Sequence, residues 1–149
     1  MKTLLIRHAH AVDSRDGGAG ADEDRWLTDK GRMVARKVGD RLRDEGYAPD
    51  AIVTSPLVRA VQTAELVARG LKFKGLVEVL ADLAPDGSLG AAADALAEKG
   101  GLVVAVGHEP GISALASHLA GRPVSAFRKG EAVLVSGGKI DYRLDPDSL

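Results

Sequence analysis

Three short apolar runs in this sequence each lead into basic or imidazole side chains, and this pattern constrains the fold more than any other feature. The runs have the length of buried strands and occupy residues 4–6, 51–53 and 102–106. Arg7 and His8 follow the first run, Arg59 follows the second, and His108 follows the third. In open α/β sheets, ligands bind outside the carboxyl ends of the strands. We therefore expect these four side chains to converge on one anion-binding site that also holds a nucleophile.

Helix signals separate the three runs. Thr28 is a suitable N-cap. The apolar residues that follow it at helical spacing are Met33, Val34, Val38 and Leu42. Ser55-Pro56 predicts a second helix, in which serine caps the N-terminus and proline takes the first helical position, with Gly70 as its end. Two further helices are expected over residues 91–98 and 110–120.

The strands and helices alternate along the chain, and this alternation predicts the fold class. The run at residues 102–106 is continuously apolar, which indicates a central parallel strand covered on both faces. Residues 76–80 are a further expected strand, and residues 132–135 and 140–144 are expected to form a closing hairpin. The whole predicts one α/β domain over residues 1–149, a three-layer α/β/α sandwich with a mostly parallel central sheet.

Composition excludes several functional classes. Lys and Arg total 20 against 21 Asp and Glu, so the chain lacks the basic excess of a nucleic-acid-binding protein. It has no cysteine, which excludes disulfides, thiolate zinc sites and a cysteine nucleophile. No apolar stretch approaches the ~20 residues of a membrane span, and the N-terminal apolar run is too short for a signal peptide. We expect a cytoplasmic protein with no nucleic-acid partner and no membrane partner.

His8 is the candidate nucleophile. A neutral imidazole is a competent nucleophile toward phosphorus, and the charge of the adjacent Arg7 disfavours the imidazolium form. The alternative is a partly buried structural histidine. The position of His8 after Arg7, at the carboxyl end of a strand, favours the functional interpretation.

Arg59 and His108 both lie near predicted helix N-termini, where free N–H groups and the helix dipole attract anions. Arginine presents a planar fork of donors that suits two phosphoryl oxygens at once. A second imidazole at His108 could donate to a phosphoryl oxygen and stabilise charge in the transition state. The alternatives are an exposed helix arginine and a histidine that caps a turn.

His10 forms a His-x-His pair with His8, a pattern that can bind a metal ion. The folds that use it after a first strand are usually (β/α)₈ barrels, which are larger than this chain. No HExxH motif accompanies the pair, and the glycine-rich nucleotide motifs and Gly-x-Ser-x-Gly are absent. We therefore expect no metal and no cofactor, and we expect His118, inside a predicted helix, to be structural.

The three segments resemble the motifs of the histidine phosphatase superfamily, which has the phosphoglycerate-mutase-like fold. The matching motifs are Arg-His-Ala at 7–9, Ser-Pro-Leu-Val-Arg-Ala-Val-Gln-Thr at 55–63 and Val-Gly-His-Glu-Pro-Gly at 106–111. They occur in the order and spacing of the family and span nearly the whole chain. The short length and the segments at 26–31 and 83–87 are similar to the SixA-type phosphohistidine phosphatases.

This resemblance implies roles for individual residues. His8 would become phosphohistidine, and Arg7, Arg59 and His108 would form the phosphate pocket. Two positions depart from the family pattern. Ala9 replaces the usual glycine, a small change that the SixA-type interpretation tolerates. Many members also place a glutamate general acid after the third strand, where this chain has Asp82, one methylene shorter. A loop-capping role for Asp82 is an equal alternative, and the weaker candidates for the acid are Asp86 and Glu109.

The resemblance implies phosphoryl transfer from a substrate to His8 and then to water, without a metal. An alkoxide is a poor leaving group that needs a proton donor, whereas the imidazole of phosphohistidine can leave already protonated. An uncertain acid therefore favours P–N substrates, and we expect a phosphohistidine-bearing protein as the partner. The alternatives are a small phosphorylated metabolite, such as a sugar phosphate or nucleotide, and a non-catalytic module that binds phospho-ligands. The polar loop at residues 16–24 fits either a protein surface or a small ligand.

Overall fold

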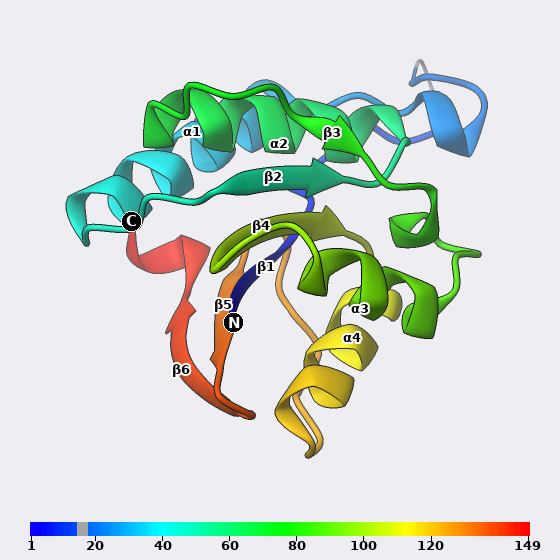
Figure 1. Ribbon diagram of the computed structural model, residues 1–149. Helices are drawn as coiled ribbons and strands as arrows, with labels where there is room; N and C mark the ends of the chain where they lie inside the picture. Colours follow the sequence, from blue (N-terminus) through cyan, green and yellow to red (C-terminus); the bar gives the residue numbers. More distant parts are fainter. Residues whose placement is uncertain (15–17) are drawn as a thin grey trace.

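A six-stranded sheet forms the centre of the computed structural model, which describes residues 1–14 and 18–149 (Figure 1). The strands are β1 Lys2–Arg7, β2 Ala51–Thr54, β3 Glu78–Val79, β4 Leu102–Gly107, β5 Ala132–Ser136 and β6 Lys139–Leu144. They lie in the order β3-β2-β4-β1-β5-β6. The pairs β1–β4, β2–β4 and β2–β3 are parallel, whereas β5 is antiparallel to both β1 and β6. The predicted mostly parallel sheet with a closing hairpin is confirmed.

Helices cover both faces of the sheet, which confirms the predicted three-layer architecture. They are α1 Asp29–Asp44, α2 Val58–Leu71, α3 Leu89–Ala97 and α4 Gly111–Ala120. α1 and α2 pack on one face, and α3 and α4 pack on the other (Figure 1). Among the described residues, no helix has both the length and the apolar character needed to cross a bilayer.

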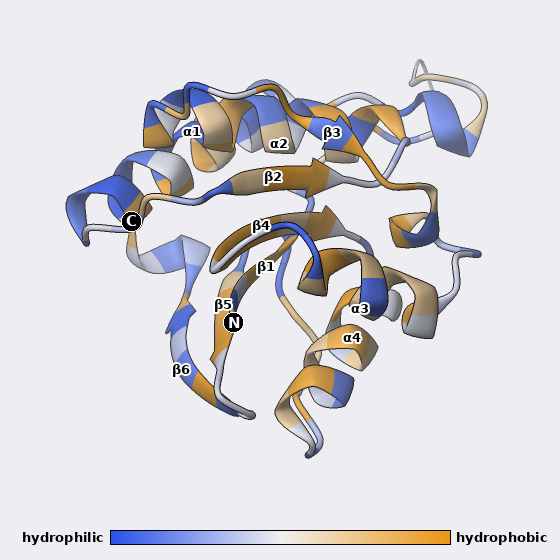
Figure 2. Ribbon diagram, viewed as in Figure 1, coloured by the Kyte–Doolittle hydropathy of each residue, from blue (hydrophilic) through white to orange (hydrophobic). Residues whose placement is uncertain are grey.

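The sheet supports two apolar cores because successive side chains of a strand point to opposite faces. In β1, Leu4 and Ile6 pack against the α1/α2 layer, whereas Leu5 packs against the α3/α4 layer. β4 is apolar along its length (Figure 2), and residues 103–107 are buried, as expected for a central strand. Only 3% of the residues are aromatic, so aliphatic side chains fill both cores.

The packing of α1 on α2 depends on two glycines. A Cβ atom on Gly39 would lie 2.4 Å from the carbonyl oxygen of Val67, and one on Gly70 would lie 2.6 Å from a backbone nitrogen of α1. α2 continues past Gly70 and is capped by Lys72, which takes a left-handed conformation with φ 56°. The prediction that Gly70 ends the second helix is therefore wrong. Gly70 is needed for the close approach of the two helices instead.

We expect Gly39→Ala to lower the free energy of unfolding by about 1–3 kcal/mol, because the added methyl group would overpack the contact between α1 and α2. Gly90→Ala in α3 is the matched control, since a Cβ atom there meets nothing within 4 Å, and it should leave stability unchanged or raise it. Urea unfolding of the two variants and the parent measures both effects. Equal stability of the two variants would contradict the packing argument.

Two details of the apolar pattern are wrong. The strand expected over residues 76–80 is confined to Glu78–Val79, and Leu76 is 87% exposed. This strand lies at the edge of the sheet and pairs only with β2, so it has little to bury its side chains against. Met33 in α1 is 58% exposed, whereas Val38 and Leu42 are buried as predicted.

Candidate active site

The carboxyl ends of three neighbouring strands lie side by side at one edge of the sheet. Arg7 in β1 pairs with Gly107 in β4, so His8 and His108 follow at adjacent positions. The backbone N–H of His8 donates to the Gly107 carbonyl oxygen at 3.0 Å, and that of Ser55, just after β2, donates to β4, also at 3.0 Å. The chain leaves β1 toward α1 and leaves β4 toward α4 on the opposite face (Figure 1). Ligands bind at such a divergence of connections in open α/β sheets.

The structure brings the four predicted side chains to this edge. The rings of His8 and His108 lie 5.2 Å apart between centroids and are tilted by 55°. His8, Arg59 and His108 are buried, and Arg7 is half-buried. Burial and the charges of Arg59 and Arg7 lower the pKa of both rings, of His8 to about 3 and of His108 to about 4. Both imidazoles are therefore neutral at pH 7.

A backbone contact determines the tautomer of His8. Its Nδ1 atom lies 2.7 Å from the carbonyl oxygen of Ala9. A carbonyl oxygen only accepts hydrogen bonds, so in the neutral ring Nδ1 carries the proton and Nε2 carries the lone pair. His8 is therefore a neutral imidazole with a basic Nε2 atom.

Ser55 holds His108 in place, a contact that the sequence did not predict. The Nε2 atom of His108 lies 2.7 Å from Ser55 Oγ, which also accepts from the backbone N–H of Leu57 at 3.2 Å. The hydroxyl proton of Ser55 can donate to Nε2, and this arrangement leaves the proton of the His108 ring on Nδ1. The expectation that Ser55 caps a helix is wrong, because α2 begins at Val58 with Leu57 as its N-cap. The Ser-Pro pattern predicts a helix cap and gives no sign of the contact with His108.

Thr63 connects Arg59 to the segment that follows β1. Its hydroxyl donates to the carbonyl oxygen of Arg59 at 2.8 Å, and the hydroxyl oxygen accepts from the backbone N–H of Ala9 at 3.1 Å. Thr63 lies four residues after Arg59, one turn further along α2, so both side chains lie on the helix face that meets β1. The helix and the residue after His8 are thereby held in one unit.

The loop before α1 also reaches the site. Arg59 donates from Nη1 to the Asp22 carbonyl oxygen at 2.9 Å and from Nη2 to the Asp22 carboxylate at 3.2 Å. The same carboxylate pairs with Arg25 at 3.1 Å. Asp22 falls within the loop predicted at residues 16–24, of which Asp16 and Gly17 lie outside the described residues. No sequence motif pointed to Asp22.

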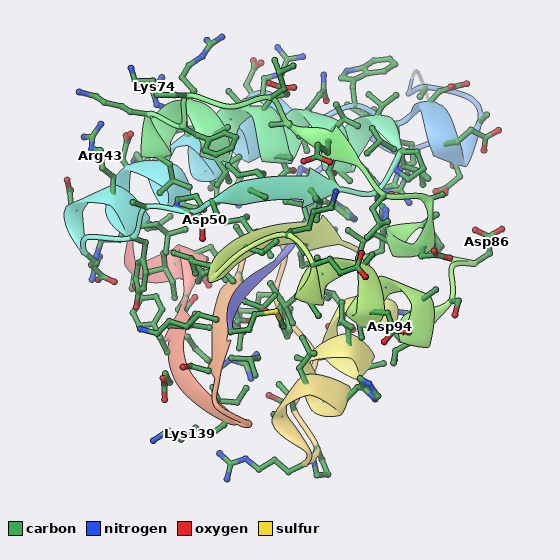
Figure 3. All side chains as sticks on the ribbon, viewed as in Figure 1. Arg43, Asp50, Lys74, Asp86, Asp94 and Lys139 are labelled. Carbon is green, nitrogen blue, oxygen red and sulfur yellow. The ribbon has the colours of Figure 1, made fainter. Side chains whose placement is uncertain are left out.

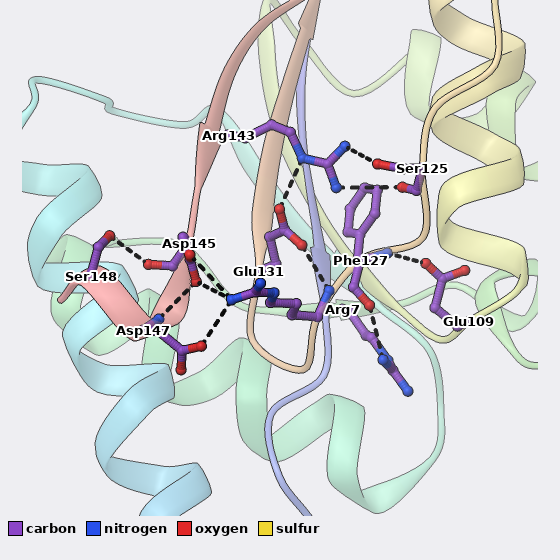
Figure 4. Close-up of polar contacts among 10 residues, drawn as sticks. Arg7, Glu109, Ser125, Phe127, Glu131, Arg143, Asp145, Asp147 and Ser148 are labelled. Carbon is purple, nitrogen blue, oxygen red and sulfur yellow. Dashed lines mark hydrogen bonds and ion pairs between the residues drawn. The ribbon is translucent and has the colours of Figure 1, made fainter.

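Arg7 is oriented by the segment that precedes β5. Its Nη1 atom donates to the Phe127 carbonyl oxygen at 2.9 Å, and the Phe127 N–H donates to the carboxylate of Glu109 (Figure 4). The other oxygen of Glu109 accepts from the Ser113 hydroxyl at 2.6 Å. Both oxygens of this candidate acid are therefore bound within the fold.

The other two candidate acids lie in different surroundings. Asp82, in the 3₁₀ turn Ala81–Leu83, lines a narrow cavity together with His108. Its carboxylate accepts from the Ser88 N–H at 3.3 Å. Asp86 is exposed at the outer edge of its loop (Figure 3). Of the three candidates, Asp82 is thus seen to share a cavity with His108.

His10 and His118 lie on the surface. The Nδ1 atom of His10 lies 2.8 Å from Thr28 Oγ1, and His118 is in the last turn of α4. Within residues 1–14 and 18–149, no three His, Asp or Glu side chains are grouped so that they could hold a metal ion.

Three buried nitrogen atoms of the site have no hydrogen-bond partner among the residues that the structure describes. They are Arg7 Nε, Arg59 Nε and His108 Nδ1. An unpaired buried donor costs about 1–3 kcal/mol, and an oxyanion offers acceptors for several donors at once. Two guanidinium groups and two neutral imidazoles thus form a set suited to a phosphoryl group.

The pH dependence of activity should reflect the lowered pKa values of His8 and His108. His8 loses the lone pair that would attack phosphorus only when it is protonated, and its pKa of about 3 places that change below pH 5. Protonation of His108, whose pKa is about 4, breaks only the hydrogen bond that it accepts from Ser55. We expect the acid limb of kcat/KM, corrected for the ionisation of the substrate, to lie below pH 5. A limb near pH 6.5, the ordinary value for histidine, would contradict this interpretation of the site.

Comparisons with known proteins agree on a family. Residues 3–84 match the model of the histidine phosphatase superfamily, branch 1. An uncharacterized protein of Picosynechococcus sp. is 38% identical over 124 residues, which cover 80% of this chain and 73% of that protein. The mitochondrial serine/threonine-protein phosphatase Pgam5 of Drosophila virilis is 36% identical over 70 residues. That match covers 47% of this chain and 23% of the Pgam5 sequence.

Solved structures show the same fold over nearly the whole chain. The protein histidine phosphatase SixA, solved with tungstate, superposes with a TM-score of 0.88 at 25% identity, covering 99% of both chains. The putative phosphohistidine phosphatase SixA of Agrobacterium tumefaciens has a TM-score of 0.84 at 23% identity and covers 97% of both chains. The second likeness shows the fold alone.

Proposed function

Because the chain belongs to the histidine phosphatase superfamily and is a phosphatase, we propose that it hydrolyses phosphohistidine on a protein through a phosphoryl group carried by His8. The contact between His8 Nδ1 and the Ala9 carbonyl oxygen, 2.7 Å, carries this proposal. It leaves the lone pair on Nε2, the atom that would attack phosphorus.

The reaction would have two steps. In the first, His8 Nε2 forms a bond to phosphorus while the bond between phosphorus and the substrate nitrogen breaks, and the substrate imidazole leaves with its proton. In the second, water attacks phosphorus while the bond from phosphorus to His8 Nε2 breaks, a proton of that water passes to solvent, and inorganic phosphate is released. The Nδ1 proton of His8 stays on the ring throughout, held by the Ala9 carbonyl oxygen.

Arg7, Arg59 and His108 would bind the phosphoryl oxygens during both steps. Their unpaired buried nitrogens supply donors that need no reorganisation when charge develops. Neutral His108, held by Ser55, would donate from Nδ1. Catalysis would then rest on positioning and on charge stabilisation, without a metal.

Asp82 is the proposed proton donor for substrates that need one. It lines the cavity beside His108, where a proton donor would protonate a leaving oxygen. A P–N substrate demands less of it than an alkoxide would. This difference favours phosphohistidine over phosphomonoesters.

The test is kcat/KM on a phosphohistidine peptide against a panel of phosphomonoesters, including sugar phosphates and nucleotides, with His8→Ala as the blank. We expect a strong preference for the phosphohistidine peptide that is lost in the blank. A preference for one monoester would make the protein a metabolite phosphatase and give Asp82 a required role. Tight phosphate binding without turnover of any substrate would favour a non-catalytic binding module.

A further inference from the structure

A groove of about 360 Å³ opens beside the active site, between the start of α1 and the segments on either side of the β5–β6 hairpin. Its lining residues are His10, Lys30, Val34, Arg128, Lys129, Pro146 and Asp147. Val34 and Pro146 contribute apolar surface, and the remaining residues are titratable or charged. The kind of ligand that the groove could bind therefore depends on which of these charged side chains lack an ion-pair partner.

The groove has an excess of unpaired positive charge. Asp147, its acidic member, pairs with Arg128 at 2.9 Å, and Asp145 takes a further Arg128 contact at 3.3 Å. Figure 4 shows the Asp145 and Asp147 carboxylates close to each other. Lys30 and Lys129 have no ion-pair partner within the described residues. Burial and the charges of Lys129 and Lys30 lower the pKa of His10, so this ring is neutral at pH 7. The two lysines therefore supply the unpaired positive charge of the groove.

The groove adjoins the nucleophile through the backbone. Gly130, the neighbour of Lys129, donates its N–H to the carbonyl oxygens of Arg7 at 3.0 Å and His8 at 3.1 Å. On the other wall, the Thr28 N–H donates to the His10 carbonyl oxygen at 3.0 Å. The positive end of α1 lies there too, since Thr28 is its N-cap. Both lysines are thus carried by segments bonded to residues 7–10.

We propose that Lys30 and Lys129 bind carboxylate side chains that flank the phosphohistidine of a protein substrate. The proposal rests on the proposed function, because the groove gains this role only if a phosphorylated protein reaches His8. The overall charge of the chain is −1, so this local cationic groove, rather than net charge, would attract an acidic partner. Exposed lysines at the rim contribute mainly through encounter and substrate affinity, not through the chemical step.

The test uses two phosphohistidine peptides that differ only in three flanking residues, Glu in one and Gln in the other. We expect the protein to hydrolyse the Glu peptide with a kcat/KM roughly 10-fold higher, through KM, and we expect added salt to shrink the difference. In the double variant Lys30→Glu, Lys129→Glu this preference should vanish or reverse. Hydrolysis of the Gln peptide should be unchanged.

Lys72→Glu, Lys74→Glu is the matched control, because it changes the net charge equally. Lys72 follows the C-terminus of α2, about 20 Å from the helix turn that carries Arg59. Equal loss of preference in this control would overturn the proposal and point to net charge. Equal hydrolysis of both peptides by the parent would also overturn it while leaving the proposed function intact.

Two further results separate the remaining outcomes. A lysine-dependent preference for a sugar bisphosphate over its monophosphate, with none between the peptides, would overturn the protein partner in favour of a small dianion. No hydrolysis of either peptide, with turnover of phosphomonoesters, would refute the proposed function itself. Thermal unfolding of both double variants checks that they fold.

Discussion

Replacing His8 with Asn is expected to lower kcat/KM on the preferred substrate by roughly 10⁴-fold or more, because the variant lacks the nitrogen that would accept the phosphoryl group. Asparagine retains a polar side chain of similar size near the Ala9 carbonyl oxygen but has no nucleophilic nitrogen. The measurement is steady-state turnover with the parent protein and the variant at equal concentration. His118→Asn is the control, since this exposed histidine lies on the surface of α4.

Retention of more than a few per cent of the activity in His8→Asn would contradict covalent catalysis. Phosphate affinity separates a catalytic loss from a binding loss. The variant keeps Arg7, Arg59 and His108, so its affinity for inorganic phosphate should stay within a few-fold of the parent. A protein that neither binds phosphate nor turns over substrate would instead indicate a disrupted pocket.

Replacing Arg59 with Ala is expected to lower kcat/KM by about 10²–10³-fold, the cost of removing one strong donor to the developing charge. Arg59 is 5% exposed, and its charge lowers the pKa of His108 more than the charge of Arg7 does. Arg59→Lys should recover only part of this loss, because a lysine keeps the charge but not the planar pair of donors. Turnover and phosphate affinity of both variants measure these effects.

Arg69→Ala, in the last turn of the same helix, is the matched control for Arg59→Ala. It removes one arginine from the exposed surface of α2 and should leave kcat/KM unchanged. Arg59→Ala also removes one of the two partners of the Asp22 carboxylate, which keeps its pair with Arg25. If Arg59→Ala were as active as Arg69→Ala, Arg59 would be a structural partner of Asp22 and not a phosphate ligand.

The architecture could be predicted from the sequence because it depends on regular patterns. Continuous apolar runs predict buried parallel strands. The carboxyl ends of β1, β2 and β4 then meet at one edge of the sheet, independently of the conformation of the loops. For this reason the amino-acid pattern alone predicts that His8, Arg59 and His108 lie near one another. Their chemical roles remain proposals that the variants above test.

The missed features depend on contacts between segments far apart in the chain. Ser55 looks like a helix cap locally, yet its hydroxyl lies 2.7 Å from His108, across the sheet edge. Asp22 sits in a polar loop with no motif, and only the fold brings it to Arg59. Gly70 looks like a helix end, but the approach of α1 makes it a packing residue. Local sequence signals cannot distinguish these alternatives, because the deciding partner lies elsewhere.

The central claim is that His8 carries the phosphoryl group, and rapid quenching during the first turnover tests it most directly. The protein is mixed with excess phosphohistidine peptide, quenched in alkali within milliseconds, digested, and examined by mass spectrometry. We predict one added phosphoryl group on the peptide that contains His8, stable in alkali and lost in acid, and absent from His8→Asn. Full turnover with no such adduct, or an adduct that persists in His8→Asn, would contradict the account.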